Sequence, residues 1–231
     1  MSAYMIKLIA CISMLLDHIG YYSSNDGLPL RVLGRLAMPI YAFFIAEGYR
    51  RTKNRLNYAL RLLLFAVISE VPFDLYFFGR TYFPGYQNVF FMLFLALIAI
   101  WVFDELSKRY ESRVPAFLSL IAFCAVSELI HSDYGWEGIL TCFIFFLYPV
   151  NEQQNMAPAA ISMLGIYFLR LISSGGNDFY MLQVFRLAAL LPLSAYNGKQ
   201  TYITSPAIRK IIQYAFYVFY PAHLLILYAV F

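Results

Sequence analysis

The chain has 231 residues, of which 61% are hydrophobic, 19% are aromatic and 13% are charged. A water-soluble domain carries about 25% charged residues, so this chain has too few polar side chains to cover a soluble globule. The high hydrophobicity and low charge also exclude an intrinsically disordered protein. The formal net charge of +4 does not indicate a nucleic-acid partner, because the basic residues lie in short loops. The composition predicts an integral membrane protein.

A membrane-spanning helix needs about 20 mainly apolar residues. We predict nine spans, at residues 5–22, 34–50, 56–78, 87–104, 114–131, 135–150, 156–174, 179–195 and 208–230. No polar stretch between them is long enough to fold alone. We therefore expect an all-α fold, a polytopic helical membrane bundle that forms a single domain over residues 1–231.

The orientation of the bundle follows from the basic residues. Lysine and arginine gather in the loops after the second and fourth spans and before the last span, and such loops are usually cytoplasmic. Nine spans then place the N-terminus inside and the C-terminus outside. The first apolar segment contains Asp17 and His18 where a cleavable signal peptide would be purely apolar, so we interpret it as a retained span.

Ionisable side chains inside these spans are the main indication of function. Burying Asp17 and His18 in a bilayer costs several kcal/mol unless they face protein or water. At a rise of 1.5 Å per residue, both lie roughly 18 Å above the inner end of the first span. The same arithmetic places His223 at a similar depth on the last span, Glu70 slightly further out on the third, and Asp74 one turn beyond. The sequence therefore predicts one polar layer in the outer half of the membrane.

Helix geometry predicts partners within this layer. Neighbouring residues on a helix point about 100° apart, so Asp17 cannot orient the ring of His18, and each needs a partner from another helix. Arg35, at the outer start of the second span, is the expected partner of Asp17. Glu70 and Asp74 are four residues apart on one helix face, so either carboxylate can accept a hydrogen bond from His18.

Each of these features also has a purely structural interpretation. Asp17 and His18 can be a buried pair that fixes helix packing, and His223 can be an interfacial residue beside an aromatic belt. The basic cluster after the second span either anchors the topology or binds the phosphates of a cytoplasmic cofactor; it comprises Arg50, Arg51, Lys53 and Arg55. The three cysteines are isolated within apolar runs, and no metal site is predicted.

Several strings of the sequence are similar to the TraX family of bacterial membrane proteins. They lie in order along nearly the whole chain: Lys7 to Gly20, Gly34 to Gly48, Ser69 to Asp74, Gln87 to Phe91, Tyr196 to Gly198 and Phe216 to Leu224. The namesake of the family is a conjugation-associated inner-membrane protein that acetylates the N-terminal amine of a pilin subunit with acetyl-CoA. The resemblance implies a multi-pass protein of the bacterial inner membrane with acetyltransferase activity. The basic pair that often follows the family's Asn-Gly is replaced here by Lys199-Gln200.

The resemblance and the polar layer together lead to one hypothesis, an acyl-CoA-dependent N- or O-acetyltransferase. His18 is expected to act as general base or as a transient acyl carrier, with His223 as the second candidate for that role. The sequence alone does not separate the two histidines. Glu70 or Asp74 is expected to orient His18 and to stabilise its cation.

The remaining expected roles concern the two substrates. Arg35, with Asn88, is expected to hold the acceptor or the developing oxyanion, while Asp17 holds Arg35. The phosphates of acetyl-CoA are expected at Arg50, Arg51, Lys53 and Arg55. The acceptor is either a pilin-like protein or an envelope glycan, and the lipids of the membrane are the other partners.

Two other functions fit the same residues. A proton-coupled transporter or flippase would use an Asp/His/Glu cluster as a proton relay. A non-catalytic assembly factor would tolerate alanine at His18.

Overall fold

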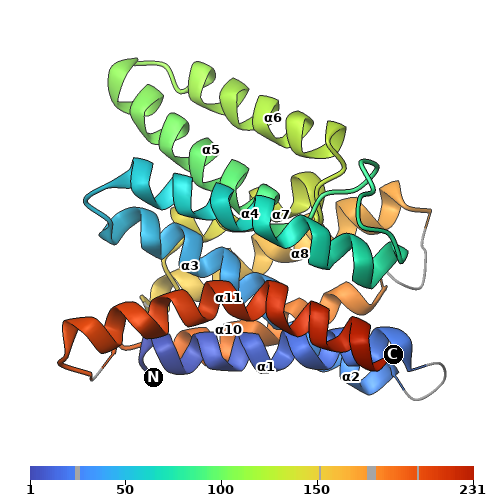
Figure 1. Cartoon of the computed structure of the whole chain (residues 1–231). Helices are drawn as coiled ribbons and strands as arrows, with labels where there is room; N and C mark the ends of the chain where they lie inside the picture. Colours follow the sequence, from blue (N-terminus) through green and yellow to red (C-terminus); the bar gives the residue numbers. More distant parts are fainter. Residues whose placement is uncertain (24–26, 151, 176–180, 202) are drawn as a thin grey trace. The chain divides into compact units, whose positions relative to one another are not determined.

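The fold is known from a computed structural model that describes residues 1–23, 27–150, 152–175, 181–201 and 203–231 (Figure 1). Its helices in chain order are α1 (Ala3–Tyr22), α2 (Leu28–Gly34), α3 (Ala37–Arg51), α4 (Arg55–Phe78), α5 (Val89–Arg109), α6 (Val114–Leu129), α7 (Gly135–Leu147), η1 (Gln153–Asn155), α8 (Met156–Ser173), η2 (Leu182–Ala189), α10 (Leu190–Ser194) and α11 (Pro206–Val230). The described residues contain no strand beyond a single isolated bridge between Gln87 and Ser132. The predicted all-α fold is confirmed.

The predicted apolar segments coincide with helices throughout the described residues. The segment predicted at 179–195 is divided between a 3-10 helix, η2, and the short helix α10. Among the residues that the structure describes, five helices are long and apolar enough to cross a membrane: Ala3–Tyr22, Leu28–Arg51 with α2 and α3 taken together, Val89–Arg109, Met156–Ser173 and Pro206–Val230. These helices support a membrane protein, while the number of nine spans and their orientation stay predictions.

The chain divides into two compact units. Unit 1 comprises Met1–Tyr41 and Tyr148–Phe231, and unit 2 comprises Ala42–Leu147. The chain passes from the first to the second within α3 and returns after α7. Each unit contains part of the predicted site: Asp17, His18, Arg35 and His223 lie in unit 1, and Glu70, Asp74 and Asn88 lie in unit 2.

In unit 1, α1 packs against both α2 and α11. The two helices α1 and α11 lie side by side (Figure 1). Their aromatic rings meet in order along the two helices, in the pairs Tyr4 with Phe216, His18 with His223, and Tyr22 with Phe231, which follows α11. Because early residues meet early residues and late meet late, α1 and α11 run parallel. Two parallel membrane-spanning helices begin on the same side of the bilayer, which is the arrangement that the N-in, C-out prediction requires.

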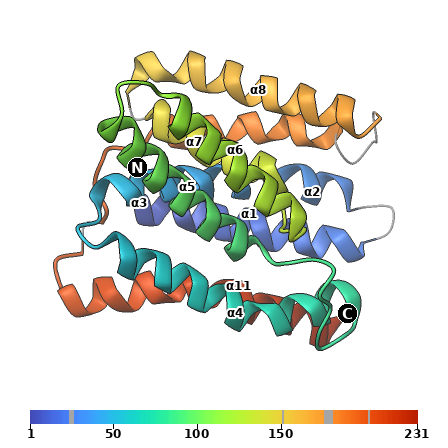
Figure 2. The ribbon, with the colours of Figure 1, turned by 90° about the horizontal axis from the view of Figure 1, so that it is seen from above.

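In unit 2, α5 packs against α4, α6 and α7 (Figure 2). The side chain of Asn54 accepts a hydrogen bond from the backbone of Asn57 and so caps the start of α4, and Asn88 caps α5 in the same manner through the backbone of Phe90. The left-handed backbone of Gly79, with φ of 63°, ends α4. The two asparagine caps satisfy backbone N–H groups that a helix start leaves without intrahelical partners.

Candidate functional site

Two histidines form the centre of the polar site in unit 1. Nδ1 of His18 on α1 lies 2.7 Å from Nε2 of His223 on α11, and Nδ1 of His223 lies 2.7 Å from the backbone oxygen of Phe219. The two imidazole planes are inclined by only 1°, with centroids 4.9 Å apart. Since a 2.7 Å contact joins their nitrogens, the rings meet edge to edge in a hydrogen bond and do not overlap face to face.

The environment of His223 restricts its motion. The residue is only 4% exposed. The ring of Phe219 lies 4.8 Å from its imidazole at an angle of 12°, and the ring of Tyr220 lies 5.7 Å away at 63°. A buried ring fixed by a carbonyl and by two aromatic neighbours presents Nε2 to His18 in one orientation.

The second part of the unit 1 site is an ion pair between Asp17 and Arg35. The Nη2 group of Arg35 donates a hydrogen bond to Oδ1 of Asp17, and Nε of Arg31 lies 3.7 Å from the same oxygen. Nη1 of Arg35 donates to Oε1 of Gln183 at 3.3 Å, and Nε donates to the backbone oxygen of Arg31 at 3.1 Å. The predicted contact of Asp17 with the second predicted span is confirmed.

Gly34 allows this ion pair to form. A Cβ atom at Gly34 would lie 2.8 Å from the Cα of Asp17 and closer still to its side chain. The absence of a side chain therefore lets α2 approach α1 at the point where Arg35 follows. Small residues at such positions are typical of tightly packed membrane helices.

Sequence reasoning missed the part played by Gln183. This residue lies on η2 and is 3% exposed, and its Oε1 accepts a hydrogen bond from Nη1 of Arg35. It therefore helps to fix the guanidinium group. The only signal was a polar amide within the apolar segment 179–195, and an uncharged amide gives no indication of its partner.

Unit 2 contains a separate group of polar residues, on α4 and at the start of α5. Nδ2 of Asn88 donates to Oε2 of Glu70 and to the backbone oxygen of Ala66, the latter at 2.7 Å. Oδ1 of Asn88 accepts from the backbone N–H of Phe90 at 3.0 Å. Both hydrogens of the amide are thus engaged within unit 2. Asn88 caps α5 and holds Glu70, which leaves it little capacity to donate to an oxyanion.

The carboxylates of Glu70 and Asp74 each have one engaged oxygen. Oδ2 of Asp74 accepts from the backbone N–H of Phe83 at 2.7 Å. The other oxygens, Oε1 of Glu70 and Oδ1 of Asp74, are buried and have no hydrogen-bond partner within the described part of the chain. A buried carboxylate oxygen that lacks a partner is costly, so this pair is suited to bind a proton or a cationic group.

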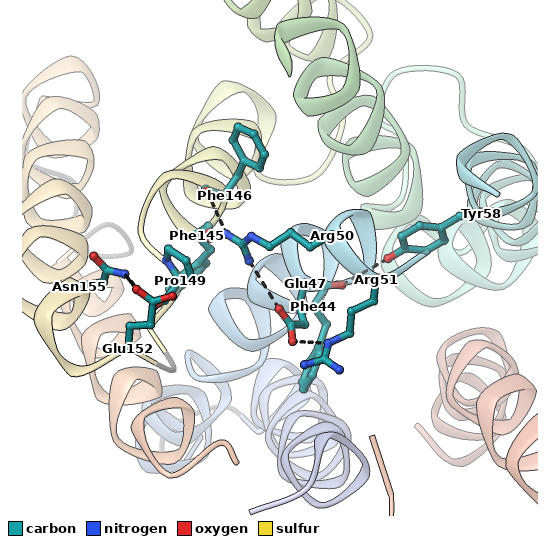
Figure 3. A network of polar contacts seen from close by, with 10 residues as sticks. All are labelled: Phe44, Glu47, Arg50, Arg51, Tyr58, Phe145, Phe146, Pro149, Glu152 and Asn155. Carbon is teal, nitrogen blue, oxygen red and sulfur yellow. Dashed lines mark hydrogen bonds and ion pairs between the residues drawn. The ribbon is translucent and has the colours of Figure 1, made fainter. Parts of the chain in front are cut away.

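The basic cluster lies at the end of α3 and the start of α4, and acids and backbone carbonyls of unit 2 hold its arginines (Figure 3). Glu47, which is 6% exposed, lies 2.5 Å from Nε of Arg51 and 3.5 Å from Nη1 of Arg50. Nη2 of Arg50 donates to the backbone oxygens of Phe145 and Phe146, the latter at 2.8 Å. These carbonyls belong to the last turn of α7, where a cation is favourable for the helix dipole.

The other two members of the cluster are Arg55, which is ion-paired, and Lys53, which is exposed. Nη1 of Arg55 lies 2.9 Å from Oε1 of Glu105, and its guanidinium group covers the ring of Tyr49 at 4.3 Å. Lys53 is exposed between α3 and α4. Arg50 and Arg55 thus connect α3, α4, α5 and α7, whereas Arg51 binds Glu47 on its own helix. A phosphate would reach Lys53 without displacing an ion pair of the described residues.

The structure brings together the predicted residues of unit 1, which are Asp17, His18, Arg35 and His223. It also brings Glu70 close to Asn88 in unit 2. The orienting partner that the structure gives to Nδ1 of His18 is His223, whereas the sequence suggested a carboxylate. The predicted contact of His18 with Glu70 or Asp74 joins different units and stays a prediction.

Comparison with known proteins identifies the family. The family model described as "TraX protein" matches residues 2–231. The chain belongs to the TraX family. This match confirms the resemblance that the sequence motifs indicated. Two of those motifs lie on α1 and α11, the helices that hold His18 and His223.

Two curated proteins are similar to this TraX-family chain. A probable fimbrial assembly protein FimC, serogroup H1, of Dichelobacter nodosus is 31% identical, over 98% of this chain and 94% of that protein. An uncharacterized protein, RP591, of Rickettsia prowazekii (strain Madrid E) is 26% identical, over 85% of this chain and 70% of that protein. No solved structure matches the chain.

Proposed function

We propose that this protein is an acetyltransferase of the bacterial inner membrane that transfers the acetyl group of acetyl-CoA to an amine. The observation that carries the proposal is the hydrogen-bonded pair of His18 and His223 in unit 1, together with the buried guanidinium group of Arg35, which pairs with Asp17, the residue before His18. An oriented imidazole can act as general base, and a fixed positive charge can stabilise the oxyanion of acyl transfer. Membership of the TraX family and the fimbrial assembly relative support a pilin-like acceptor.

The proposed reaction has one proton acceptor. The acceptor amine attacks the thioester carbonyl, forming the C–N bond, and its proton moves to His18. The carbonyl oxygen becomes an oxyanion, which the guanidinium charge of Arg35 stabilises. The C–S bond then breaks, and the CoA thiolate takes the proton from His18, so the products are an acetylated amine and CoA thiol.

Asp17 and Gln183 have a supporting role in this mechanism. Contacts with Asp17, Gln183 and the backbone of Arg31 hold the guanidinium group of Arg35. A preorganised charge costs no reorganisation when the oxyanion forms, which is why fixed donors are effective in catalysis. Asp17 is therefore a positioning residue for Arg35 in this proposal.

Within the basic cluster, Lys53 is proposed to be the main contact of the CoA phosphates. Lys53 is exposed between α3 and α4, whereas the arginines around it hold Glu47 and Glu105. An exposed ammonium group attracts phosphate as a point charge. Lys53→Gln is expected to raise the KM for acetyl-CoA and leave kcat little changed.

The test uses the purified full chain in proteoliposomes with acetyl-CoA labelled in its acetyl group. The acceptor is a peptide with an N-terminal amine, and the control is the same peptide with that amine blocked. We expect label on the first peptide alone, and no label with His18→Asn. Equal labelling by His18→Asn, or labelling of the blocked peptide, would overturn the proposal.

A second function, proton-coupled transport, is favoured by one observation. Oε1 of Glu70 and Oδ1 of Asp74 are buried without a hydrogen-bond partner in the described residues, and such carboxyls bind and release protons in transporters. A transporter would acidify the lumen of the same proteoliposomes when a substrate gradient is applied, and it would gain no thermal stability from acetyl-CoA. A ligand that binds only the native state raises the melting temperature, so acetyl-CoA binding separates the two functions.

A further inference from the structure

The hydrogen bonds of the histidine pair have a fixed direction at one end. The backbone oxygen of Phe219 can only accept, so Nδ1 of His223, 2.7 Å away, carries a hydrogen and donates it. Phe219 precedes His223 by four residues, and one turn of α11 brings the carbonyl to the imidazole. The tautomer of His223 is thereby set by its own helix.

The direction of the next hydrogen bond follows from this tautomer. A neutral His223 with its hydrogen on Nδ1 has a lone pair on Nε2, and this lone pair accepts the Nδ1–H of His18 at 2.7 Å. His18 in turn has its lone pair on Nε2. Each ring therefore donates from Nδ1, and the chain of donors runs from His18 through His223 to the carbonyl of Phe219.

The opposite direction would require a charged pair. A doubly protonated His223 would donate to Nδ1 of His18 and so place the hydrogen of His18 on Nε2. The guanidinium groups of Arg31 and Arg35 already act on His18, and both contact the carboxylate of Asp17. A neutral pair adds no further charge to this buried site, so the geometry and the charge balance favour the first direction.

We propose that His223 is the positioning residue of His18: it fixes the ring orientation and tautomer that leave the lone pair of His18 on Nε2. His223 itself takes no proton from the acceptor. The catalytic consequence of this inference rests on the proposed function. The inference assigns the role of base to His18, a choice between His18 and His223 that the sequence left open.

His223 also supports the charged state of His18. When Nε2 of His18 takes a proton, its Nδ1–H remains hydrogen-bonded to Nε2 of His223, and the carbonyl of Phe219 lies at the end of the same chain. Hydrogen bonds to charged groups are stronger than those between neutral groups. In serine proteases, an aspartate accepts a hydrogen bond from Nδ1–H of the catalytic histidine and so holds its tautomer. In this protein a second imidazole, that of His223, has the same role.

A matched set of substitutions tests this role. His223→Gln can place its amide oxygen near the position of Nε2, where it accepts from His18, whereas His223→Leu has the bulk of a side chain but no acceptor. His18→Asn retains a donor near the position of Nδ1 and lacks Nε2. We expect kcat to fall by less than about 10-fold in His223→Gln, by about 10²-fold or more in His223→Leu, and below detection in His18→Asn.

The KM for acetyl-CoA and the thermal melting temperature serve as controls. A residue that only maintains the fold would lower the melting temperature of His223→Leu and His223→Gln together with their activity. A positioning residue predicts that His223→Gln rescues kcat, with KM unchanged in both variants. Equal loss of kcat in the glutamine and leucine variants, both folded, would overturn the inference.

A spectroscopic measurement tests the tautomer without any activity. The ¹⁵N chemical shifts of selectively labelled histidine, assigned by comparison with the His18→Asn and His223→Gln variants, distinguish a protonated nitrogen from one with a lone pair. We expect a protonated Nδ1 and a lone pair on Nε2 for both residues. A hydrogen on Nε2 of His18 would overturn the inference even if acetyl transfer occurs, while an inactive wild type with the expected shifts would overturn the proposed function alone.

Discussion

Removing the carboxylate of Asp17 is expected to destabilise unit 1 severely. Arg35 is 4% exposed, and Asp17 is its carboxylate partner. The variant Asp17→Leu leaves the guanidinium group buried without that charge. Breaking a buried ion pair in this manner costs about 3–5 kcal/mol of unfolding free energy, or about 6–20 °C in melting temperature for a chain of this length.

Variants of Arg35 isolate the contribution of the ion pair itself. Arg35→Leu is expected to cost less than Asp17→Leu, because the carboxylate of Asp17 keeps Nε of Arg31 at 3.7 Å. The double variant Asp17→Leu/Arg35→Leu is expected to lie near the wild type, since apolar residues of similar size often replace a buried ion pair without loss.

The assay is thermal unfolding of the purified chain in one detergent, followed for the wild type, both single variants and the double variant. The cycle gives the coupling energy of the pair directly. A melting temperature of Asp17→Leu equal to that of the wild type, or a double variant less stable than either single variant, would refute the reasoning. Acetyl transfer is expected to be lost in all three variants, because each removes the fixed charge of Arg35 or its support.

Two further predictions concern close contacts in the two units. Gly34→Ala is expected to cost about 1–3 kcal/mol, because the added Cβ would meet the backbone of Asp17; an unchanged melting temperature would contradict the close approach of α1 and α2. Asn88→Ala is expected to cost about 1–3 kcal/mol through loss of the α5 cap and of the hydrogen bond to Glu70. Asn88→Ser, which keeps the cap, is expected to recover part of that loss, and equal melting temperatures of the two variants would exclude the cap as its source.

The helices could be predicted from the sequence because apolar runs bounded by breakers require little tertiary information. The segment predicted at 5–22 is α1, and the segment predicted at 208–230 is α11, each within two residues. The pair of Asp17 and Arg35 could also be predicted, because a buried acid needs a cation and Arg35 is at the start of the next apolar segment.

The histidine pair could not be predicted in the same way. His18 and His223 are separated by 205 residues, and the chemistry of imidazole allows a carboxylate partner as readily as another imidazole. Depth arithmetic placed both histidines at one level without indicating that α1 and α11 are adjacent. The contacts of Asn88 were missed for a similar reason, since an amide at a helix start fits a cap and a catalytic donor equally well.

The central claim is that His18 is the base of an acetyl transfer. The most direct test is mass spectrometry of an amine-bearing peptide after incubation with labelled acetyl-CoA and proteoliposomes that contain either the wild type or His18→Asn. The account predicts an acetylated peptide with the wild type and an unmodified peptide with the folded His18→Asn variant. Acetylation at the same rate with both proteins would contradict it.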